Sequence, residues 1–299
     1  TGSNNTFVGK QAGYGGTTSA PFSSGQNNVA LGYQAFKSFT SAEANTAIGY
    51  NALMDVTSGG YNTGLGFQAG YNLSSGANNT AVGAYALYSS QTISYDTAIG
   101  FGALMDNTGN GSNVAIGWNA MTETTTAGHN VAIGYEALKW GTHVRTIAIG
   151  YGAMNDTNAG STSMGSTDNV FIGYDAGGGT WADAASVKNV AIGNYAMDSA
   201  LNGADSNVAV GYNALSGLTT GDFNIGIGHG AGYAITTGAS NIIFGRLAGD
   251  TMTTTSNTVL IGHDAGGAIN STDANGTVAI GYAALTALTD GVANIAIGQ

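Results

Sequence analysis

The sequence contains no cysteine, a single proline and few charged residues. Without cysteine there is no disulfide framework, so stability has to come from packing and from association between chains. Six Lys and Arg against 17 Asp and Glu give a net charge of −11. This balance argues against nucleic acid or an anionic membrane surface as a partner, because both need clustered basic side chains. No apolar run approaches the length of a bilayer span, so we expect no membrane insertion.

Glycine, in contrast, is abundant, with 50 copies among 299 residues. It does not occur at every third residue, which excludes collagen. Instead it marks a nine-residue phrase, best seen as NTAIGYNAL at residues 45–53. Six successive intervals between marker glycines, from Gly32 to Gly134, are 17 residues long, and a fixed period of this size is typical of repeat architectures. The marker glycines are Gly9, Gly32, Gly49, Gly66, Gly83, Gly100, Gly117, Gly134, Gly150, Gly173, Gly193, Gly211, Gly228, Gly245, Gly262, Gly281 and Gly298.

Each copy of the phrase is numbered here from its marker glycine, which is position 0. Position −3 is Thr, Val or Ile, position −1 is apolar, and position −2 is mostly Ala. β-Branched residues that alternate with small ones predict a strand of four or five residues, because side-chain direction reverses at each residue. Strands this short need stacked neighbours, so each copy is interpreted as one rung of a coil.

We therefore predict an all-β fold: a parallel β-roll or β-solenoid of about 17 rungs with roughly 17 residues each. The repeat covers residues 1–299, so we expect a single repeat domain and no separate globular domain. Insertions lie near residues 14–27, 155–168, 177–188 and 266–276, and insertions into repeats often carry binding sites. No cap is visible after the last copy, so we expect a part of a longer fibre.

Three repeat positions are expected to form structural columns. Position −4 is Asn in thirteen copies, and stacked Asn side chains can hydrogen-bond to their copies in neighbouring rungs. We also expect this Asn to take the left-handed backbone of a corner. Gly at 0 suits a close approach of backbone, and Ala at +3 suggests a place for a methyl group only. The residues assigned to these columns are Asn28, Asn45, Asn62, Asn79, Asn113 and Asn130, with Gly32, Gly49, Gly66, Gly83, Gly117 and Gly134, and Ala52, Ala69 and Ala86.

Both faces of each strand are apolar, so both need a cover. We expect the Ile/Val face to fill the inside of the coil. The small-residue face, with aromatic residues at +1 and Leu or Met at +4, then needs a second chain, and identical chains around one axis supply it. This favours a homotrimer; the alternative is a monomeric solenoid that buries every apolar side chain itself.

Apart from the repeat itself, no motif in the sequence indicates a catalytic, cofactor or metal site. The glycines of residues 226–232 overlap a dinucleotide pattern only by chance, because the strand–turn–helix context is missing. His229 and His263 are two rungs apart, too far for one metal within a chain. Aspartates are scattered through the turns, where they cap backbone groups. Pairs such as Asp168 with Asp175 or with Asp183 leave a carboxylate-based glycosidase open. We expect no catalytic, cofactor or metal site.

The phrase NVAIG, at residues 113–117, 130–134 and 189–193, resembles the head repeat of trimeric autotransporter adhesins of the YadA type. The longer phrase at 45–53 is similar to arrays in bacteriophage tail fibres. The resemblance implies a left-handed, trimeric β-roll that is extracellular or carried on a virion and has no catalytic activity. The rungs are longer than those of the autotransporter type, which favours the fibre.

These observations predict a structural fibre or adhesin shaft that projects from a particle or attaches to a host cell surface. Its expected partners are itself, a cell-surface glycan or protein receptor, and other fibre or baseplate proteins. Exposed aromatic residues suit receptor contacts because they offer rigid faces with polar tips, and the candidates are Tyr14, Phe22, Trp140 and Trp181. The alternatives are a bacterial surface adhesin, a filament-forming matrix protein and, less favoured, a polysaccharide-degrading tailspike.

Overall fold

A computed structural model of the chain describes residues 2–15, 23–124, 128–155, 165–181 and 184–299. The chain forms two compact units, Thr1–Val144 and Arg145–Gln299, and both are built from the same repeat. The division falls at the irregular copy in which Thr146 replaces the usual Asn. Within the described ranges the regular structure consists of three-residue strands and one 3₁₀ turn, η1 (Thr272–Ala274), which lies in the insertion near residues 266–276.

Strands of the first unit are β1 (Thr6–Val8), β2 (Val29–Leu31), β3 (Thr46–Ile48), β4 (Thr63–Leu65), β5 (Thr80–Val82), β6 (Thr97–Ile99), β7 (Val114–Ile116) and β8 (Val131–Ile133). Those of the second are β9 (Ile147–Ile149), β10 (Val170–Ile172), β11 (Val190–Ile192), β12 (Val208–Val210), β13 (Ile225–Ile227), β14 (Ile242–Phe244), β15 (Val259–Ile261), β16 (Val278–Ile280) and β17 (Ile295–Ile297).

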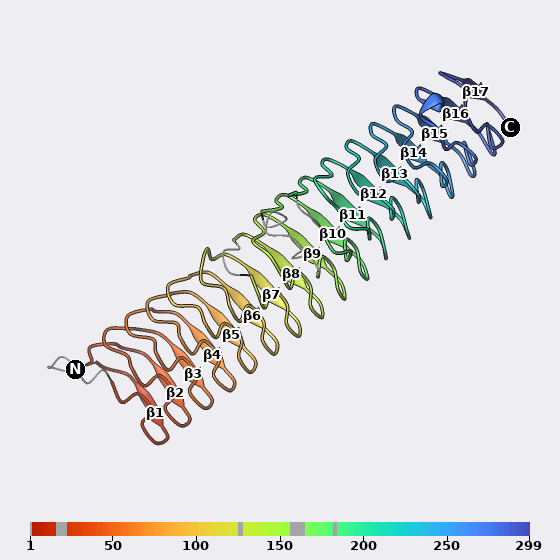
Figure 1. Ribbon diagram of the computed structural model, residues 1–299. Helices are drawn as coiled ribbons and strands as arrows, with labels where there is room; N and C mark the ends of the chain where they lie inside the picture. Colours follow the sequence, from red (N-terminus) through yellow and green to blue (C-terminus); the bar gives the residue numbers. More distant parts are fainter. Residues whose placement is uncertain (1, 16–22, 125–127, 156–164, 182–183) are drawn as a thin grey trace. The chain divides into compact units, whose positions relative to one another are not determined.

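Within each unit, every strand pairs in parallel with the strand of the next repeat (Figure 1). The register joins equivalent positions, as when Ala47 of β3 lies opposite Gly64 of β4. This arrangement confirms the predicted parallel β-solenoid with one strand in each turn of about 17 residues. The strands are one or two residues shorter than expected, because each ends at the residue before its marker glycine.

The marker glycines adopt a backbone that other residues avoid, with φ values such as +138° at Gly117 and +135° at Gly100. They also stack closely. A Cβ added to Gly117 would occupy the space of the carbonyl oxygen of Gly134 in the next turn. Both restrictions act at once, so glycine is required at this position for conformation and for space.

The inside of the coil differs from our expectation: the small-residue face points inward, and the Ile/Val face points outward. The Ala residues at −2 and +3 and the Leu or Met residues at +4 are fully buried, as Ala98, Ala103 and Leu104 show. The coil is narrow, so the strand side of the interior has room for a methyl group only, and the long side chain comes from the opposite wall.

Exchanges of volume between positions −2 and +4 support this assignment. Where −2 carries a large residue, as at Phe171 or Leu260, position +4 is glycine. A Cβ on Gly177 would lie against the ring of Phe171, and one on Gly266 would lie 2.9 Å from a methyl group of Leu260. In two turns both positions are glycine, and a leucine of the preceding turn fills the space, as Leu53 does beside Gly64 and Gly70. The interior is therefore close-packed through exchanges within a turn and between neighbouring turns.

A second correction concerns the corners. The asparagines at −4 do not take the left-handed backbone; the residues at −5, +2 and +4 do. Tyr95, Asn119 and Leu104 are examples, with φ of 67°, 51° and 53°. Non-glycine residues seldom adopt this conformation. Here the stacked hydrogen bonds of neighbouring turns hold them in place.

The −4 side chains form a hydrogen-bonded column within each unit. Oδ1 of each Asn accepts the backbone N–H of the next one, as from Asn45 to Asn28 at 2.9 Å and from Asn62 to Asn45 at 2.9 Å. Nδ2 donates to a turn carbonyl, such as Gly59 O at 3.0 Å from Asn45. Each amide thus joins the strand to the following turn. Side-chain amides of neighbouring turns also bond to one another, as from Nδ2 of Asn45 to Oδ1 of Asn28 at 3.1 Å and from Nδ2 of Asn241 to Oδ1 of Asn224 at 2.9 Å. The column therefore combines bonds between side chains with bonds to the backbone.

Candidate interaction surface

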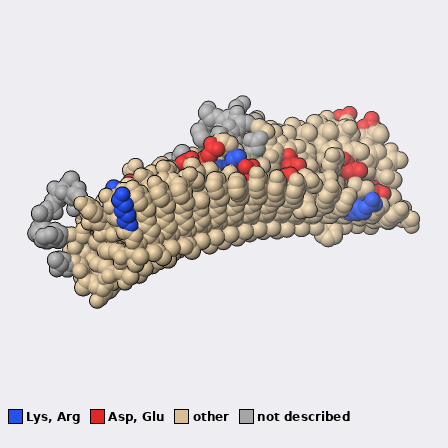
Figure 2. Space-filling model, turned by 90° about the horizontal axis from the view of Figure 1, so that it is seen from below, with Lys and Arg blue, Asp and Glu red and all other residues tan. Residues whose placement is uncertain are grey.

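The outward strand face carries an apolar band in each unit: position −1 is apolar at every strand, and position −3 is Thr in five strands of the first unit and Val or Ile in the others. Position −1 is exposed to 46% at Leu31 in the first unit and to 40% at Ile192 in the second. Other exposed residues at −3 and −1 are Val8, Val29, Leu65, Ile99, Ile225, Ile242, Phe244, Ile261, Ile295 and Ile297. In the view of Figure 2, acidic and basic side chains are scattered between broad stretches of other residues. Contiguous exposed apolar surface of this kind marks an interaction site.

Aromatic side chains at +1 run beside this band. Tyr33, Tyr50 and Phe67 stack face to face, with ring centroids 5.2 Å apart at both steps. In the second unit Tyr151 stacks on Tyr174 at 5.2 Å. Because the ring faces contact one another, mainly their edges are presented to a partner.

In two of the copies that lack an aromatic residue at +1, a tyrosine one position later takes its place. Where Ala84 stands at +1, Tyr85 packs edge-on against Phe67 and Phe101, with centroids 5.3 and 5.7 Å apart. Tyr195 does the same beside Asn194. The sequence shows this shift, but our position-by-position comparison missed it.

The four predicted receptor contacts lie in different environments. Tyr14 is 62% exposed, and Trp140 is half-buried, with Nζ of Lys139 5.2 Å from its ring centroid. Phe22 lies outside the described residues. Trp181 is fully buried: its Nε1–H donates to the carbonyl of Gly177 at 3.0 Å, and its ring packs against an interior phenylalanine. The prediction of Trp181 as a receptor contact is therefore wrong, because its side chain fills the core.

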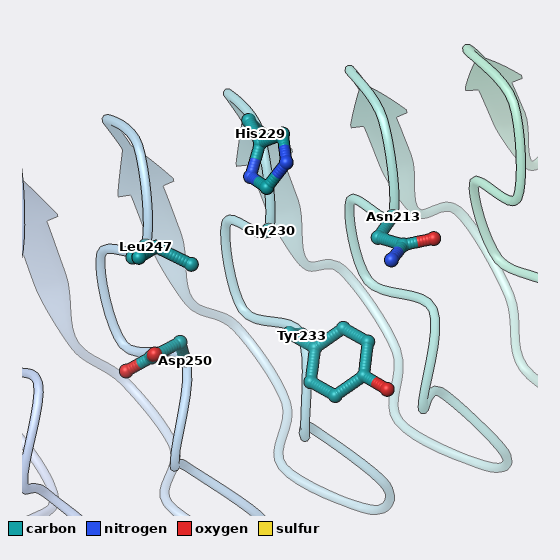
Figure 3. A pocket seen from close by; sticks show the side chains of 6 residues that line it. All are labelled: Asn213, His229, Gly230, Tyr233, Leu247 and Asp250. Atoms are coloured by element: carbon teal, nitrogen blue, oxygen red, sulfur yellow. The ribbon is translucent and has the colours of Figure 1, made fainter.

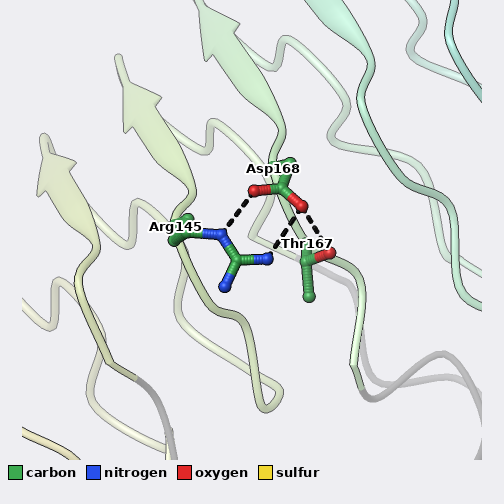
Figure 4. A network of polar contacts seen from close by, with 3 residues as sticks. All are labelled: Arg145, Thr167 and Asp168. Carbon is green, nitrogen blue, oxygen red and sulfur yellow. Dashed lines mark hydrogen bonds and ion pairs between the residues drawn. The ribbon is translucent and has the colours of Figure 1, made fainter.

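A small charged cluster occupies the −5 corner of the second unit (Figure 4). Nε and Nη2 of Arg145 contact the two carboxylate oxygens of Asp168 at 2.6 and 2.9 Å, and Oγ1 of Thr167 donates to the same carboxylate at 3.0 Å. The hydrogen bonds from Arg145 lower the pKa of Asp168. Both charges are well solvated, so the pair contributes little to stability.

Two of the three carboxylates considered for glycoside hydrolysis, Asp168 and Asp175, lie among the described residues. Asp168 forms an ion pair with Arg145, while the charge of Asp175 acts on the pKa of Asp198 in the next turn. Burial, with a smaller contribution from Asp175, raises the pKa of Asp198 to about 6. Asp183 lies outside the described residues. Asp175 and Asp198 are therefore a further pair of neighbouring carboxylates, and the pair of Asp168 with Asp183 stays a prediction.

The two histidines at position +1 make contacts with different residues. His229 stacks on Tyr212 with centroids 5.2 Å apart, whereas Nε2 of His263 lies 2.6 Å from Nη1 of Arg246. Among the described residues, no group of three or more His, Asp or Glu could hold a metal ion. The helical structure in those ranges also falls short of what crossing a bilayer requires.

Comparison with known protein families and with curated proteins found no match to this sequence. The features of the chain that bear on its function are therefore the repeat and the outward apolar band.

Proposed function

We propose that this chain is the shaft of a fibre or adhesin appendage, extracellular or carried on a virion. It assembles as a homotrimer of left-handed coils and projects or attaches to a host cell surface. Its other partners are fibre or baseplate proteins and a receptor of glycan or protein. The observation that supports this proposal is the outward apolar band on the strands of each unit.

The band calls for a partner of matching length. Residues such as Leu65 and Ile99 are about two-fifths exposed, at 44% and 37%, and equivalent residues follow at each turn. A second copy of this chain carries the same band at the same spacing. Identical chains in parallel thus bury it in register, and closed symmetry protects every copy equally.

Three copies suit the shape of the band. A strand of three residues is roughly 10 Å wide at a rise of about 3.3 Å per residue. We therefore propose that one narrow face on each chain closes around a threefold axis. The exposed residues of the band are Val, Leu, Ile and Phe, so like charges do not face one another across this contact.

Light scattering tests the assembly. We expect a particle of three times the 29.7 kDa chain mass. Ile192→Lys places charges at the centre of the proposed contact and is expected to give monomers or aggregates, because a buried unpaired charge costs several kcal/mol. Thr220→Lys, an exposed substitution in the turn between β12 and β13, is the matched control. A monodisperse monomer of the wild-type chain contradicts the trimer.

Attachment is tested on whole cells with fluorescent protein, comparing wild type with Ile192→Lys. Binding that depends on the assembled form supports the adhesin shaft. Unlimited end-to-end growth in electron micrographs supports a matrix filament instead, and release of reducing sugar from host polysaccharide supports a tailspike. Absence of cell attachment by the intact trimer contradicts the adhesive part of the proposal and leaves a purely structural shaft.

A further inference from the structure

The second unit contains a surface hollow of about 200 Å³ between three successive turns (Figure 3). The turns are those that follow β12, β13 and β14. The hollow is lined by Asn213, His229, Gly230, Tyr233, Leu247 and Asp250, and most of its wall is carbon.

The hollow is centred on Gly230, at position +2 of its turn. The neighbouring turns carry Asn213 and Leu247 at this position, so one side chain is missing from the row. Two other turns also have glycine at +2. At Gly102 the amide oxygen of Asn119 lies 2.5 Å from the place of a Cβ, whereas the nearest atom at Gly230 is a methyl carbon of Leu247, at 2.8 Å.

Polar groups from all three turns surround the carbon wall. Figure 3 shows Asn213 from the first turn, His229 and Tyr233 from the second, and Asp250 from the third. Within the part of the chain that the structure describes, the side-chain polar atoms of Asn213, His229 and Tyr233 make no hydrogen bond. Tyr233 is 49% exposed. An amide, an imidazole, a phenol and a carboxylate are thus available around one aromatic face.

We propose that this hollow binds a single neutral pyranose ring. The inference deepens the proposed function, on which it rests, by locating a glycan contact in the shaft. A pyranose has a C–H face that packs on an aromatic ring and hydroxyl groups at its edge that need mixed donors and acceptors. The residues around Gly230 offer both: Tyr233 and Leu247 for the C–H face, and Asn213, His229 and Asp250 for the hydroxyls.

The volume of the hollow and the charge around it restrict the class of sugar that it can bind. The volume is below the roughly 300–1,000 Å³ of sites for larger ligands, so one ring is accommodated and further sugar units extend into solvent. The carboxylate of Asp250 lies at the rim of a chain with net charge −11, so uronic acids and other anionic sugars are repelled. Affinity at one site is weak, with a Kd on the order of 1 mM, as expected for a small half-open site. Repetition in three chains raises the avidity.

Saturation-transfer NMR on the full-length assembled protein tests the inference. The probes are the methyl glycosides of glucose, galactose and mannose, methyl glucuronide as the anionic counterpart, and phenol as a purely aromatic ligand. We expect transfer to the C–H protons of at least one neutral glycoside and little to the glucuronide.

Variants place the signal at the hollow. Tyr233→Ala removes the aromatic face and is expected to weaken binding at least about tenfold. Gly230→Asn fills the gap with a residue that the row already accommodates at Asn119 and Asn213, and is expected to abolish binding. Tyr71→Ala changes the same repeat position in the first unit and leaves affinity unchanged. If Gly230→Asn fails to fold by circular dichroism, Tyr233→Ala carries the test.

The inference is wrong if no neutral glycoside shows saturation transfer, or if the transfer persists in Tyr233→Ala or in a folded Gly230→Asn protein. It is also wrong if the glucuronide binds more tightly than the neutral glycosides, or if phenol is the only probe that binds. These outcomes are separable from the proposed function. A trimer that attaches to cells but binds no glycoside contradicts only the hollow. A protein that binds glycosides as a monomer contradicts the trimeric shaft.

Discussion

Replacing Asp96 by Asn is expected to stabilise the first unit at neutral and alkaline pH and to have little effect in acid. Asp96 stands where most copies have Asn and is only 1% exposed. Its Oδ1 accepts the N–H of Asn113 at 2.7 Å, but Oδ2 has no partner among the described residues. The turn carbonyl at the equivalent place, on Asn110, receives hydrogen bonds from the side chains of Asn107 and Asn113 instead.

The size of the expected change in stability follows from the pKa of Asp96 in the folded protein. Burial raises the pKa of Asp96 from 3.8 to about 7, partly offset by the hydrogen bonds from Asn113. The folded state therefore binds a proton more tightly than the unfolded state. The contribution to stability is fully present below pH 3.8, declines as the pH rises, and is lost above pH 7. At 1.36 kcal/mol per unit the loss is about 4 kcal/mol, which corresponds to about 8–16 °C in the melting temperature of a unit this size.

The assay is thermal unfolding followed by circular dichroism at pH 4 and pH 8. D96N should melt well above wild type at pH 8 and close to it at pH 4. The comparison uses two proteins because Asp198, whose pKa burial raises to about 6, adds its own pH dependence to both. D106N, in the same turn, controls for net charge, and N79D should reproduce the defect at pH 8. An equal effect of D96N at both pH values would refute the reasoning.

Three further predictions test the geometry of the coil by thermal or denaturant unfolding. Gly117→Ala combines an unfavourable φ of +138° with a clash against the carbonyl of the next turn, so we expect the free energy of unfolding to fall by about 3 kcal/mol or more. Gly298→Ala is the control, because Gly298 has a similar φ of +129° but no atom within 4 Å of the added Cβ. An equal decrease in both variants contradicts the steric part of the prediction. Leu104→Ala empties the interior and should cost about 2–5 kcal/mol, whereas Ile116→Ala on the outward face costs much less in the isolated chain; the reverse order contradicts our assignment of the faces. Arg145→Ala removes an exposed ion pair and should leave the melting temperature nearly unchanged, most clearly at high salt; a large decrease means that the corner is structurally important.

The sequence alone predicts the period, the strand positions and the columns. These features repeat in phase, so a single copy that departs from the pattern does not obscure them. Position 0 has no room for a Cβ, and position +3 has no room for a side chain larger than a methyl group. Such restrictions are visible in a list of residues, and the structure explains them by close stacking of Gly117 on Gly134 and by the narrow interior around Ala103.

Which strand face points inward could not be predicted by the same reasoning. Ile and Val normally occupy cores, so composition favoured the wrong side. The decisive signal was the exchange of volume between positions −2 and +4, seen in Phe171 with Gly177. The burial of Trp181 and the hollow at Gly230 depend on the conformation of particular turns, which a repeat average does not contain.

The asparagine column has a direction. In the bonds from Asn45 to Asn28 and from Asn62 to Asn45, the acceptor belongs to the copy that precedes in the chain. An elongating polypeptide therefore finds its acceptor already fixed as each new copy leaves the ribosome. Winding can keep pace with translation, since every finished coil is the template for the one that follows.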